Sequence, residues 1–367
     1  MLRHLCRCRP AYAGLVLSCT AFTFATPGMA ATARCVADSA QLAAALVDAN
    51  AANADPQFLI KLRTGTFSAT PSGFRVAPQR GGQILRLSGG YSDAGCQNKT
   101  YGPARTTLVG ATNRHALEFT LGIGDLAGGQ LHLQDVDLTN SDFGGASGGA
   151  CLSGTVYPGN TAVVERVATR DCRAPWGTDA SIWLANHGIL TLRNVQARSG
   201  TANYNGGIGV ITSGSGLSRL AQVSVTTTQS SAGNAVFSGL RLSNDGNAVA
   251  HLSNSVIWGN DSDPGTADLA VHGPGITLTR VHYGTLLGTP AANLAPGTGD
   301  PGFVAANDPH LRADSILVDS GATDPVGGSG PLDLDGNLRT QGVALDVGAH
   351  ERPVPDAIFW NGFDFTD

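Results

Sequence analysis

The sequence predicts an all-β protein whose chain winds into a solenoid of parallel strands. Two observations lead to this fold class. Glycine makes up 49 of the 367 residues, and because each glycine costs about 1 kcal/mol in a helix interior, an all-α fold is excluded. In addition, one strand-like segment is present in several copies between residues 131 and 283. The apolar fraction of 42% is sufficient for a packed core and excludes general disorder.

The copies share a fixed order of apolar and polar positions. They align on an anchor that recurs about every 29 residues. The anchors are Val136, Val167, Val195, Val223, Ser255 and Val281. An aliphatic residue stands three positions before each anchor: Leu133, Val164, Leu192, Leu220, Leu252 and Leu278. A polar residue stands directly before each anchor: Asp135, Arg166, Asn194, Gln222, Asn254 and Arg280.

This order predicts a bend inside each copy. Residues two apart point to the same face of a strand. Each copy has an apolar pair, two polar residues and a second apolar pair, so a straight strand would place the two pairs on opposite faces. A bend between the pairs turns both of them into one interior. Each copy is therefore predicted to form a strand, a corner and a strand, and neighbouring coils are predicted to pair in parallel.

Weaker copies and caps complete the predicted solenoid. Short β-type runs at residues 58–62, 83–87 and 106–109 extend it to about nine coils. A helix over residues 39–48, with Ser39 as its N-cap, is expected to cover the first coil. Residues 285–330 lose the repeat and are rich in Gly, Pro and Asp, which predicts a loop wrapped over the last coils.

Residues 1–30 are predicted to be a signal peptide. Three arginines precede a largely apolar stretch over residues 11–24. Ala31-Thr32-Ala33 matches the A-x-A cleavage pattern, so cleavage is expected between Ala30 and Ala33. Residues 16–19 weakly resemble a lipoprotein cleavage box, which leaves lipidation as the alternative. No later stretch approaches 18 consecutive apolar residues, so no membrane-spanning segment is expected.

The predicted organisation has five segments. They are the signal peptide (1–30), a cap helix region (35–56), the parallel β-helix (57–285), C-terminal coils with a closing loop (286–352) and a C-terminal tail (353–367).

Charge and cysteine content restrict partners and compartment. Without the leader the chain has 20 basic and 28 acidic side chains, a balance that argues against nucleic acid as a partner. Four cysteines remain after the leader, an even number in a chain expected to be exported, which predicts disulfides. The simplest pairing is Cys35–Cys96 and Cys151–Cys172, although the sequence alone does not fix the connectivity.

Two segments resemble one family of exported proteins. The first runs from Leu87-Ser-Gly-Gly-Tyr-Ser92 through Cys96 to Thr106-Thr-Leu-Val-Gly110. The second has the order D-x-x-G-x-x-R, a short gap and D-x-G-A-x-E, with His350 in place of the usual aromatic residue. Its matching residues are Asp333, Gly336, Arg339, Asp346, Gly348, Ala349 and Glu351.

In these segments the chain resembles the bacterial exported β-helix proteins that carry a choice-of-anchor Q domain and share the fold of pectate lyases. The resemblance implies a single-stranded right-handed parallel β-helix, located in the medium or on the outer surface of a Gram-negative bacterium. Residues 358–364 resemble a short tail found on exported proteins of related bacteria. The family implies no settled biochemical activity.

Catalytic residues are not expected from the aligned copies. No outward column stacks two acids on adjacent coils, as a calcium-dependent pectate lyase requires, and Asp-Asp does not occur. Asn186-His187-Gly188 is the one partial match to the polygalacturonase G-H-G motif. The expected function is a non-catalytic binding, adhesion or structural module that contacts glycans or the cell envelope. A polysaccharide lyase or glycoside hydrolase is the alternative.

Two sets of residues are candidates for glycan contact. Arg170 and Arg198 are expected on neighbouring coils, where they either clamp a sugar carboxylate or lie solvated on the surface. Four aromatic residues either form a sugar-stacking platform or pack against the fold. They are Trp176, Trp183, Tyr204 and Trp258. A polysaccharide or an envelope component is the expected partner, and the protein is expected to be a monomer.

The closing segment has two alternative interpretations. One interpretation is a calcium loop, because the order D-x-D-G-N at Asp333-Leu334-Asp335-Gly336-Asn337 resembles the start of an EF-hand loop. The other ligands of an EF-hand are lacking. No cofactor is therefore expected, with calcium as the open alternative. The other interpretation is a structural lock in which Arg339 pairs with Asp346 or Glu351 to fix the closing turn.

Overall fold

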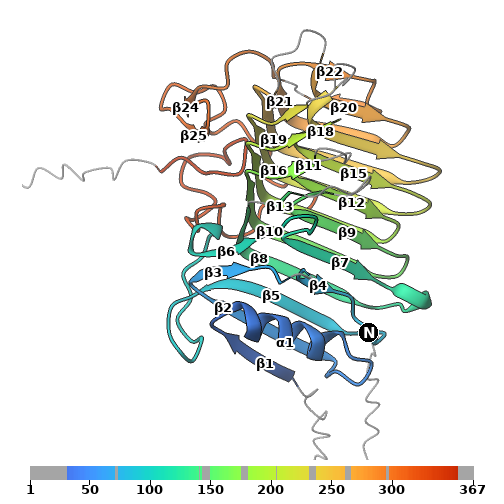
Figure 1. Cartoon of the computed structure of the whole chain (residues 1–367). Coiled ribbons are helices and arrows are strands. Elements are labelled where there is room, and N and C mark those ends of the chain that lie inside the picture. Colours follow the sequence, from blue (N-terminus) through green and yellow to red (C-terminus); the bar gives the residue numbers. More distant parts are fainter. Residues whose placement is uncertain are drawn as a thin grey trace, which may run out of the picture.

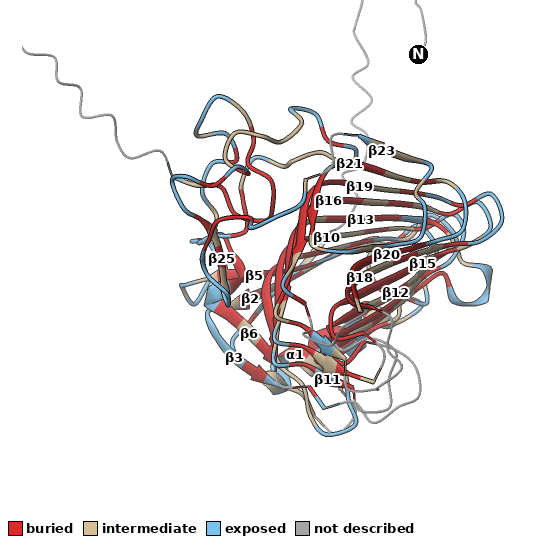
Figure 2. Cartoon of the chain, turned by 90° about the horizontal axis from the view of Figure 1, so that it is seen from above, coloured by how far each residue is buried: buried red, intermediate tan, exposed pale blue. Residues whose placement is uncertain are grey.

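The chain forms a right-handed parallel β-solenoid of about eight turns, one fewer than predicted. The computed structural model describes residues 31–70, 73–139, 141–142, 149–174, 181–203, 205–230, 237–260, 266–294 and 297–353. The coils stack along one axis, and neighbouring coils pair strand to strand (Figure 1). Buried residues concentrate on the strands that enclose the common interior (Figure 2). The predicted leader and most of the predicted tail lie outside the described residues.

Two large sheets run the length of the solenoid, and one small sheet spans three adjacent coils. The first sheet consists of β1 (Ala31–Val36), β2 (Gln57–Arg63), β5 (Ile84–Tyr91), β8 (Gln130–Thr139), β10 (Thr161–Arg170), β13 (Ile189–Arg198), β16 (Leu217–Thr226), β19 (Val249–Trp258), β21 (Ile276–Tyr283) and β23 (Ala292–Leu294), with β3 (Gly65–Ser68) and β6 (Thr106–Val109) branching from it. The second consists of β4 (Arg75–Val76), β7 (Leu117–Leu121), β9 (Leu152–Val156), β12 (Ile182–Asn186), β15 (Ile208–Thr212), β18 (Phe237–Asn244), β20 (Ala267–His272) and β22 (Leu286–Leu287). The small sheet consists of β11 (Arg173–Ala174), β14 (Thr201–Ala202) and β17 (Gln229–Ser230).

Each predicted corner lies at one residue within a long strand of the first sheet. All six polar residues that precede an anchor have a left-handed backbone: φ is 58° at Asp135, 50° at Arg166, 53° at Asn194, 52° at Gln222, 45° at Asn254 and 54° at Arg280. The strands pair in register on both sides of these corners. The bend therefore turns the apolar pairs on both sides of each corner into one interior, as the sequence predicts.

The aliphatic residues before the corners form a continuous ladder through the core. Leu133 pairs with Val164, Val164 with Leu192, and the ladder continues to Leu278. All of these side chains are fully buried. Because residues on both sides of each corner face the same interior, one hydrophobic core extends from the N-terminal helix to the last coil.

The N-terminal end is closed by a helix and by an additional strand. Helix α1 (Ser39–Asn50) buries Leu42 and Leu46 against the first coil. Its N-cap is Asp38 instead of the predicted Ser39, since the Asp38 carboxylate accepts a hydrogen bond from Gln41 N at 2.8 Å. Residues expected around the cleavage site belong to strand β1, which pairs in parallel with β2.

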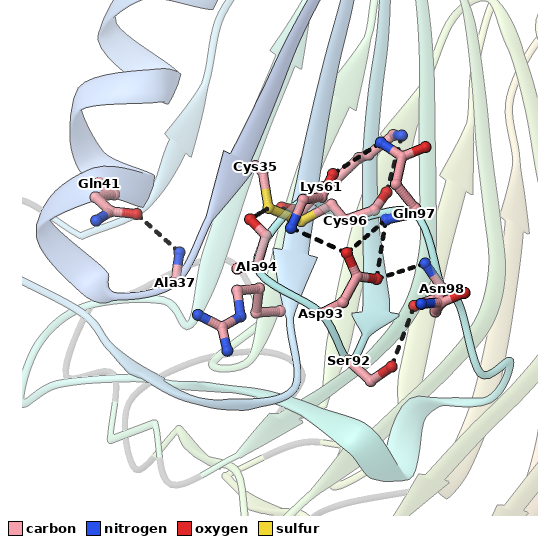
Figure 3. The surroundings of a disulfide bond; sticks show 12 residues. Cys35, Ala37, Gln41, Lys61, Ser92, Asp93, Ala94, Cys96, Gln97 and Asn98 are labelled. Atoms are coloured by element: carbon pink, nitrogen blue, oxygen red, sulfur yellow. Dashed lines mark hydrogen bonds between the residues drawn. A yellow bond between two sulfur atoms is a disulfide. The ribbon is translucent and has the colours of Figure 1, made fainter.

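Two disulfides tie segments together, and their pairing is the one that the sequence favours. Cys35–Cys96 joins β1 to the loop after β5, where Asp93 accepts hydrogen bonds from the backbone N–H groups of Gln97 and Asn98 (Figure 3). Cys151–Cys172 joins the start of β9 to the start of β11. No helix in the described part of the chain is long and apolar enough to cross a membrane.

The sequence predicts that the C-terminal region covers the last coils. In the structure this region also extends back along earlier coils. It first forms an antiparallel hairpin of β24 (Phe303–Ala305) and β25 (Asp308–Leu311). Residues 319–351, the C-terminal strap, then return along the outside of the first sheet (Figure 1). The strap bonds to Asn254, then to Asn194 two coils earlier, and reaches the backbone beside Gly102.

The strap gives hydrogen-bond partners to two buried polar corner residues, Asn194 and Asn254. Asn194 Nδ2 donates to Ser329 O at 2.9 Å and to Leu332 O at 2.8 Å. Asn254 Nδ2 donates to Ala322 O at 2.8 Å, and its Oδ1 accepts from Ala322 N at 2.8 Å. The strap backbone thus takes the place of the water that these amides would bind if the corners were exposed.

Candidate functional site

Arg339 is the centre of the closing motif. Its side chain is 2% exposed and donates to the carbonyl oxygens of Ala349 at 3.2 Å, Asp346 at 3.2 Å and Gly348 at 2.6 Å. Its Nε lies 3.6 Å from Glu351 Oε2. Burial raises the pKa of Glu351 to about 7, although Arg339 acts in the opposite direction. The pairing of Arg339 with Glu351 is one of the two alternatives that the lock interpretation named.

The carboxylates of Asp333 and Asp346, the two other acids of the closing motif, accept hydrogen bonds from backbone N–H groups. Asp333 accepts hydrogen bonds from Asn337 N at 2.7 Å and Glu351 N at 2.9 Å. Asp346 accepts from Asp319 N and from Arg352 N, both at 2.7 Å. Desolvation by burial raises the pKa of both aspartates. These bonds, together with the left-handed Gly336 and Gly348, shape the strap.

The calcium-loop interpretation does not agree with the directions of its carboxylates. Asp333 bonds to the backbone inside the strap, whereas Asp335 Oδ2 lies against the ring nitrogens of His310 and His350. The two carboxylates therefore do not converge into the cage of oxygen ligands that calcium prefers.

A polar cleft of about 300 Å³ lies where the strap and the β24–β25 hairpin meet the solenoid. We call it the junction cleft. Its solenoid wall comes from β8, β10 and β13, and the opposite wall from β25 and the strap. The lining residues are Pro103, Ala104, Thr107, Asp137, Ala168, Arg170, Gln196, Arg198, Asp308, Pro309, His310, Leu334, Asp335 and His350.

The structure brings Arg170 and Arg198 together on the solenoid wall of this cleft. They are register partners on β10 and β13, one coil apart. Arg170 Nε and Nη2 both lie 2.9 Å from Asp137 Oδ2. Arg198 Nη1 donates to Asn307 O at 3.1 Å, and among the described residues it has no carboxylate partner. Burial raises the pKa of Asp137 against the opposing effect of Arg170.

Two histidines share one carboxylate on the opposite wall. Asp335 Oδ2 lies 2.9 Å from His310 Nε2 and 2.7 Å from His350 Nδ1. Asp308 Oδ1 bonds to the other ring nitrogen of His310. The hydrogen bond with Asp335 raises the pKa of His310 to about 9, although desolvation opposes this shift. Burial acts to raise the pKa of Asp335, but the two histidines outweigh it and hold that pKa well below its usual range.

The aromatic candidates do not form one platform in the described structure. Trp183 is on β12 in the second sheet, and Trp258 is on β19 in the first. Trp176 and Tyr204 lie outside the described residues. Asn186 is fully buried, and its side chain donates to Leu217 O and to Ser218 Oγ, both at 2.9 Å, so this residue has a structural role.

Sequence reasoning did not identify Asp308 and His310, and it recorded His350 only as a departure from a motif. Two signals were available. Asp308 and His310 are two apart on a strand and therefore share a face. His350 puts an imidazole at a position where the resembled family has an aromatic ring. Their meeting depends on the path of the strap, which no local pattern predicts.

The fold and the cleft define a parallel β-solenoid protein with a charged cleft on its flank. Compared with protein-family models, curated proteins and solved structures, the chain shows no match.

Proposed function

We propose that this protein is an exported β-helix binding module, of the choice-of-anchor Q type, whose junction cleft holds a carboxylate-bearing polysaccharide without cleaving it. The observation that carries the proposal is the placement of Arg170 and Arg198 on adjacent coils of one cleft wall. Adjacent coils are about 4.8 Å apart, so two guanidinium groups on neighbouring coils are close enough to contact the same anionic ligand.

The charge distribution in the cleft supports an anionic ligand. Arg170 is balanced by Asp137, but Arg198 has only a backbone carbonyl as its partner among the described residues. An arginine without a carboxylate retains donors that fit a ligand carboxylate in a two-pronged arrangement. His310 faces the same cleft, and its raised pKa favours the cationic form in the absence of a metal.

Binding to purified full-length protein tests this proposal. Polygalacturonate and alginate are titrated calorimetrically, with neutral dextran as the control ligand. Arg198→Gln is expected to lower affinity for the acidic polymers at least tenfold, since one charge-assisted contact contributes roughly 1.5–3 kcal/mol. Arg86→Gln, which removes an exposed arginine on β5 outside the cleft, is the matched control and should leave affinity unchanged.

Two outcomes contradict the proposal. Equal binding of dextran, or equal affinity of the Arg198→Gln and wild-type proteins, would remove the junction cleft as the binding site. Release of unsaturated or reducing ends from either acidic polymer would replace the binding function by the alternative, a polysaccharide lyase or glycoside hydrolase.

A further inference from the structure

We propose that His310, Asp335 and His350 form a binding site for a divalent transition-metal ion of the zinc class. The proposal is independent of glycan binding, because all three ligands come from the chain itself. One nitrogen of each imidazole and one oxygen of the carboxylate lie within 4.8 Å of one another. The ligands of a tetrahedral zinc ion are separated by roughly 3.3 Å, so small side-chain movements would bring these atoms around an ion.

The chemistry of the ligand set selects the class of ion. Imidazole nitrogen is a preferred ligand of zinc and similar transition metals, whereas calcium and magnesium take oxygen ligands. Two histidines and one carboxylate leave at least one coordination position for water or a ligand group. When both imidazoles are neutral, the carboxylates of Asp335 and the adjacent Asp308 together carry two negative charges, which balance the charge of a divalent ion.

Asp308 supplies the outer support that metal-binding histidines require. Its Oδ1 bonds to His310 Nδ1, on the side of the ring opposite Asp335. A carboxylate in this position holds the hydrogen on Nδ1, so that Nε2 is the nitrogen left for an ion once its proton, which bonds to Asp335 when no metal is bound, is released. The ring orientation of His310 therefore suits coordination.

His350 is the second independent observation. The residue is 5% exposed, and its only hydrogen bond within the described part of the chain is the one from Nδ1 to Asp335. Its Nε2 is buried without a hydrogen-bond partner in the described part of the chain, and a bound ion is one way in which such a nitrogen is satisfied. The His350 and His310 rings lie close together, with centroids 4.0 Å apart.

The site would be accessible and would join two C-terminal elements. The side chains of His310 and Asp335 are 43% and 38% exposed, so an ion can enter from the junction cleft. His310 belongs to β25, whereas Asp335 and His350 belong to the strap. A bound ion would therefore fasten the hairpin to the strap.

Metal titration of the tag-free, full-length protein, stripped with a chelator and without glycan, tests the proposal. We expect one Zn²⁺ per chain by calorimetry and native mass spectrometry, and ligand-field bands of a low-coordinate site with Co²⁺. At a free Zn²⁺ concentration a hundred times Kd, the unfolding temperature should rise by about 5 °C. Ca²⁺ should produce no shift.

Substitutions locate the ion. His310→Ala, Asp335→Asn and His350→Ala should each weaken Zn²⁺ binding at least tenfold, and the positioning variant Asp308→Asn about tenfold. His251→Ala, which removes a partly exposed histidine of β19 outside the cleft, should bind as the wild type does. Circular dichroism confirms that each variant is folded. The absence of Zn²⁺ binding, or binding that none of the four cleft variants weakens, would overturn the proposal.

Discussion

At the scale of the residue, the corner positions combine backbone strain with a polar contact. A left-handed backbone costs most residues about 1–2 kcal/mol, and asparagine and aspartate tolerate it best. Asn194 and Asn254 occupy this conformation and also bond to the strap. At the first two corners the charges pair instead: Asp135 lies 2.7 Å from both Arg166 Nε and Lys99 Nζ.

Substitution of Asn194 separates these two contributions. Asn194→Ala leaves the carbonyl groups of Ser329 and Leu332 without their donor and puts alanine, which tolerates the left-handed region less well than asparagine, at this position. We expect a loss of about 2–4 kcal/mol in the free energy of unfolding. Asn194→Gly removes the same hydrogen bonds but relaxes the backbone, so it should be about 1 kcal/mol more stable than the alanine variant. Urea denaturation measures both values; identical stabilities of the two variants would show that the backbone contributes nothing.

The alternation of polar and apolar residues predicted where the corners lie but not how buried they are. Asp135, Asn194 and Gln222 are polar residues between apolar pairs, and such residues are expected to face solvent. All three are fully buried: Asn194 bonds to the strap, far away in sequence, and Asp135 bonds to Lys99, Arg166 and the backbone N–H of Gly102. Local patterning carries no information about these long-range contacts.

At the scale of the element, the N-terminal end combines a strand, a helix and a disulfide. β1 pairs along its whole length with β2, while α1 covers the core beside it. The Cys35–Cys96 disulfide fastens β1 to the loop after β5. The helix was predictable from its run of alanine and leucine. The strand was not, because its first residues match a cleavage pattern and its side chains are mostly exposed.

Removal of the Cys35–Cys96 disulfide should release β1 first. In the double variant Cys35→Ser/Cys96→Ser we expect about 2–4 kcal/mol less stability, because the unfolded chain regains the freedom of the closed loop. Hydrogen exchange should accelerate in Ala31–Val36 before it does in β10 or β13. The matched variant Cys151→Ser/Cys172→Ser should instead accelerate exchange around β9 and β11. Unchanged exchange of β1 in the first variant would contradict this assignment.

At the scale of the whole molecule, the strap connects coils that otherwise contact only their neighbours. In a solenoid, stability is nearly a sum of terms between adjacent coils. Here one segment bonds to β19 and to β13 and lies against the backbone at Gly102. Unfolding of one end is therefore expected to involve the other through the strap.

Arg339→Leu tests whether the strap acts as a unit. The substitution removes the positive charge beside the buried Glu351 and one donor from each of three buried carbonyl groups, so we expect a loss of about 3–5 kcal/mol. Hydrogen exchange should accelerate throughout residues 319–351 and at the corners that they cover. Val343→Ser, at a strap residue that is 91% exposed, is the control and should have little effect. If exchange changes only near residue 339, the strap consists of independent contacts.

The solenoid was predictable from sequence because its information is repeated in every coil. Leu133, Leu192 and Leu252 align in sequence for the same reason that they stack in space. The junction cleft was not predictable in the same way. Its walls come from the repeats, the β24–β25 hairpin and the strap, and the last two have no periodicity. Only lining residues that belong to the repeats, such as Arg170 and Arg198, could be assigned to neighbouring positions in advance.

The position of the strap at the end of the chain also sets an order of events during biosynthesis. The acceptors of Asn194 are 135 and 138 residues further along the sequence. At roughly 5–20 residues per second, a ribosome needs several seconds or longer to produce them after Asn194 has emerged. Until then the corners of finished coils stay hydrated. Nascent or prematurely terminated chains should therefore present an open flank to proteases, which would distinguish them from the completed protein.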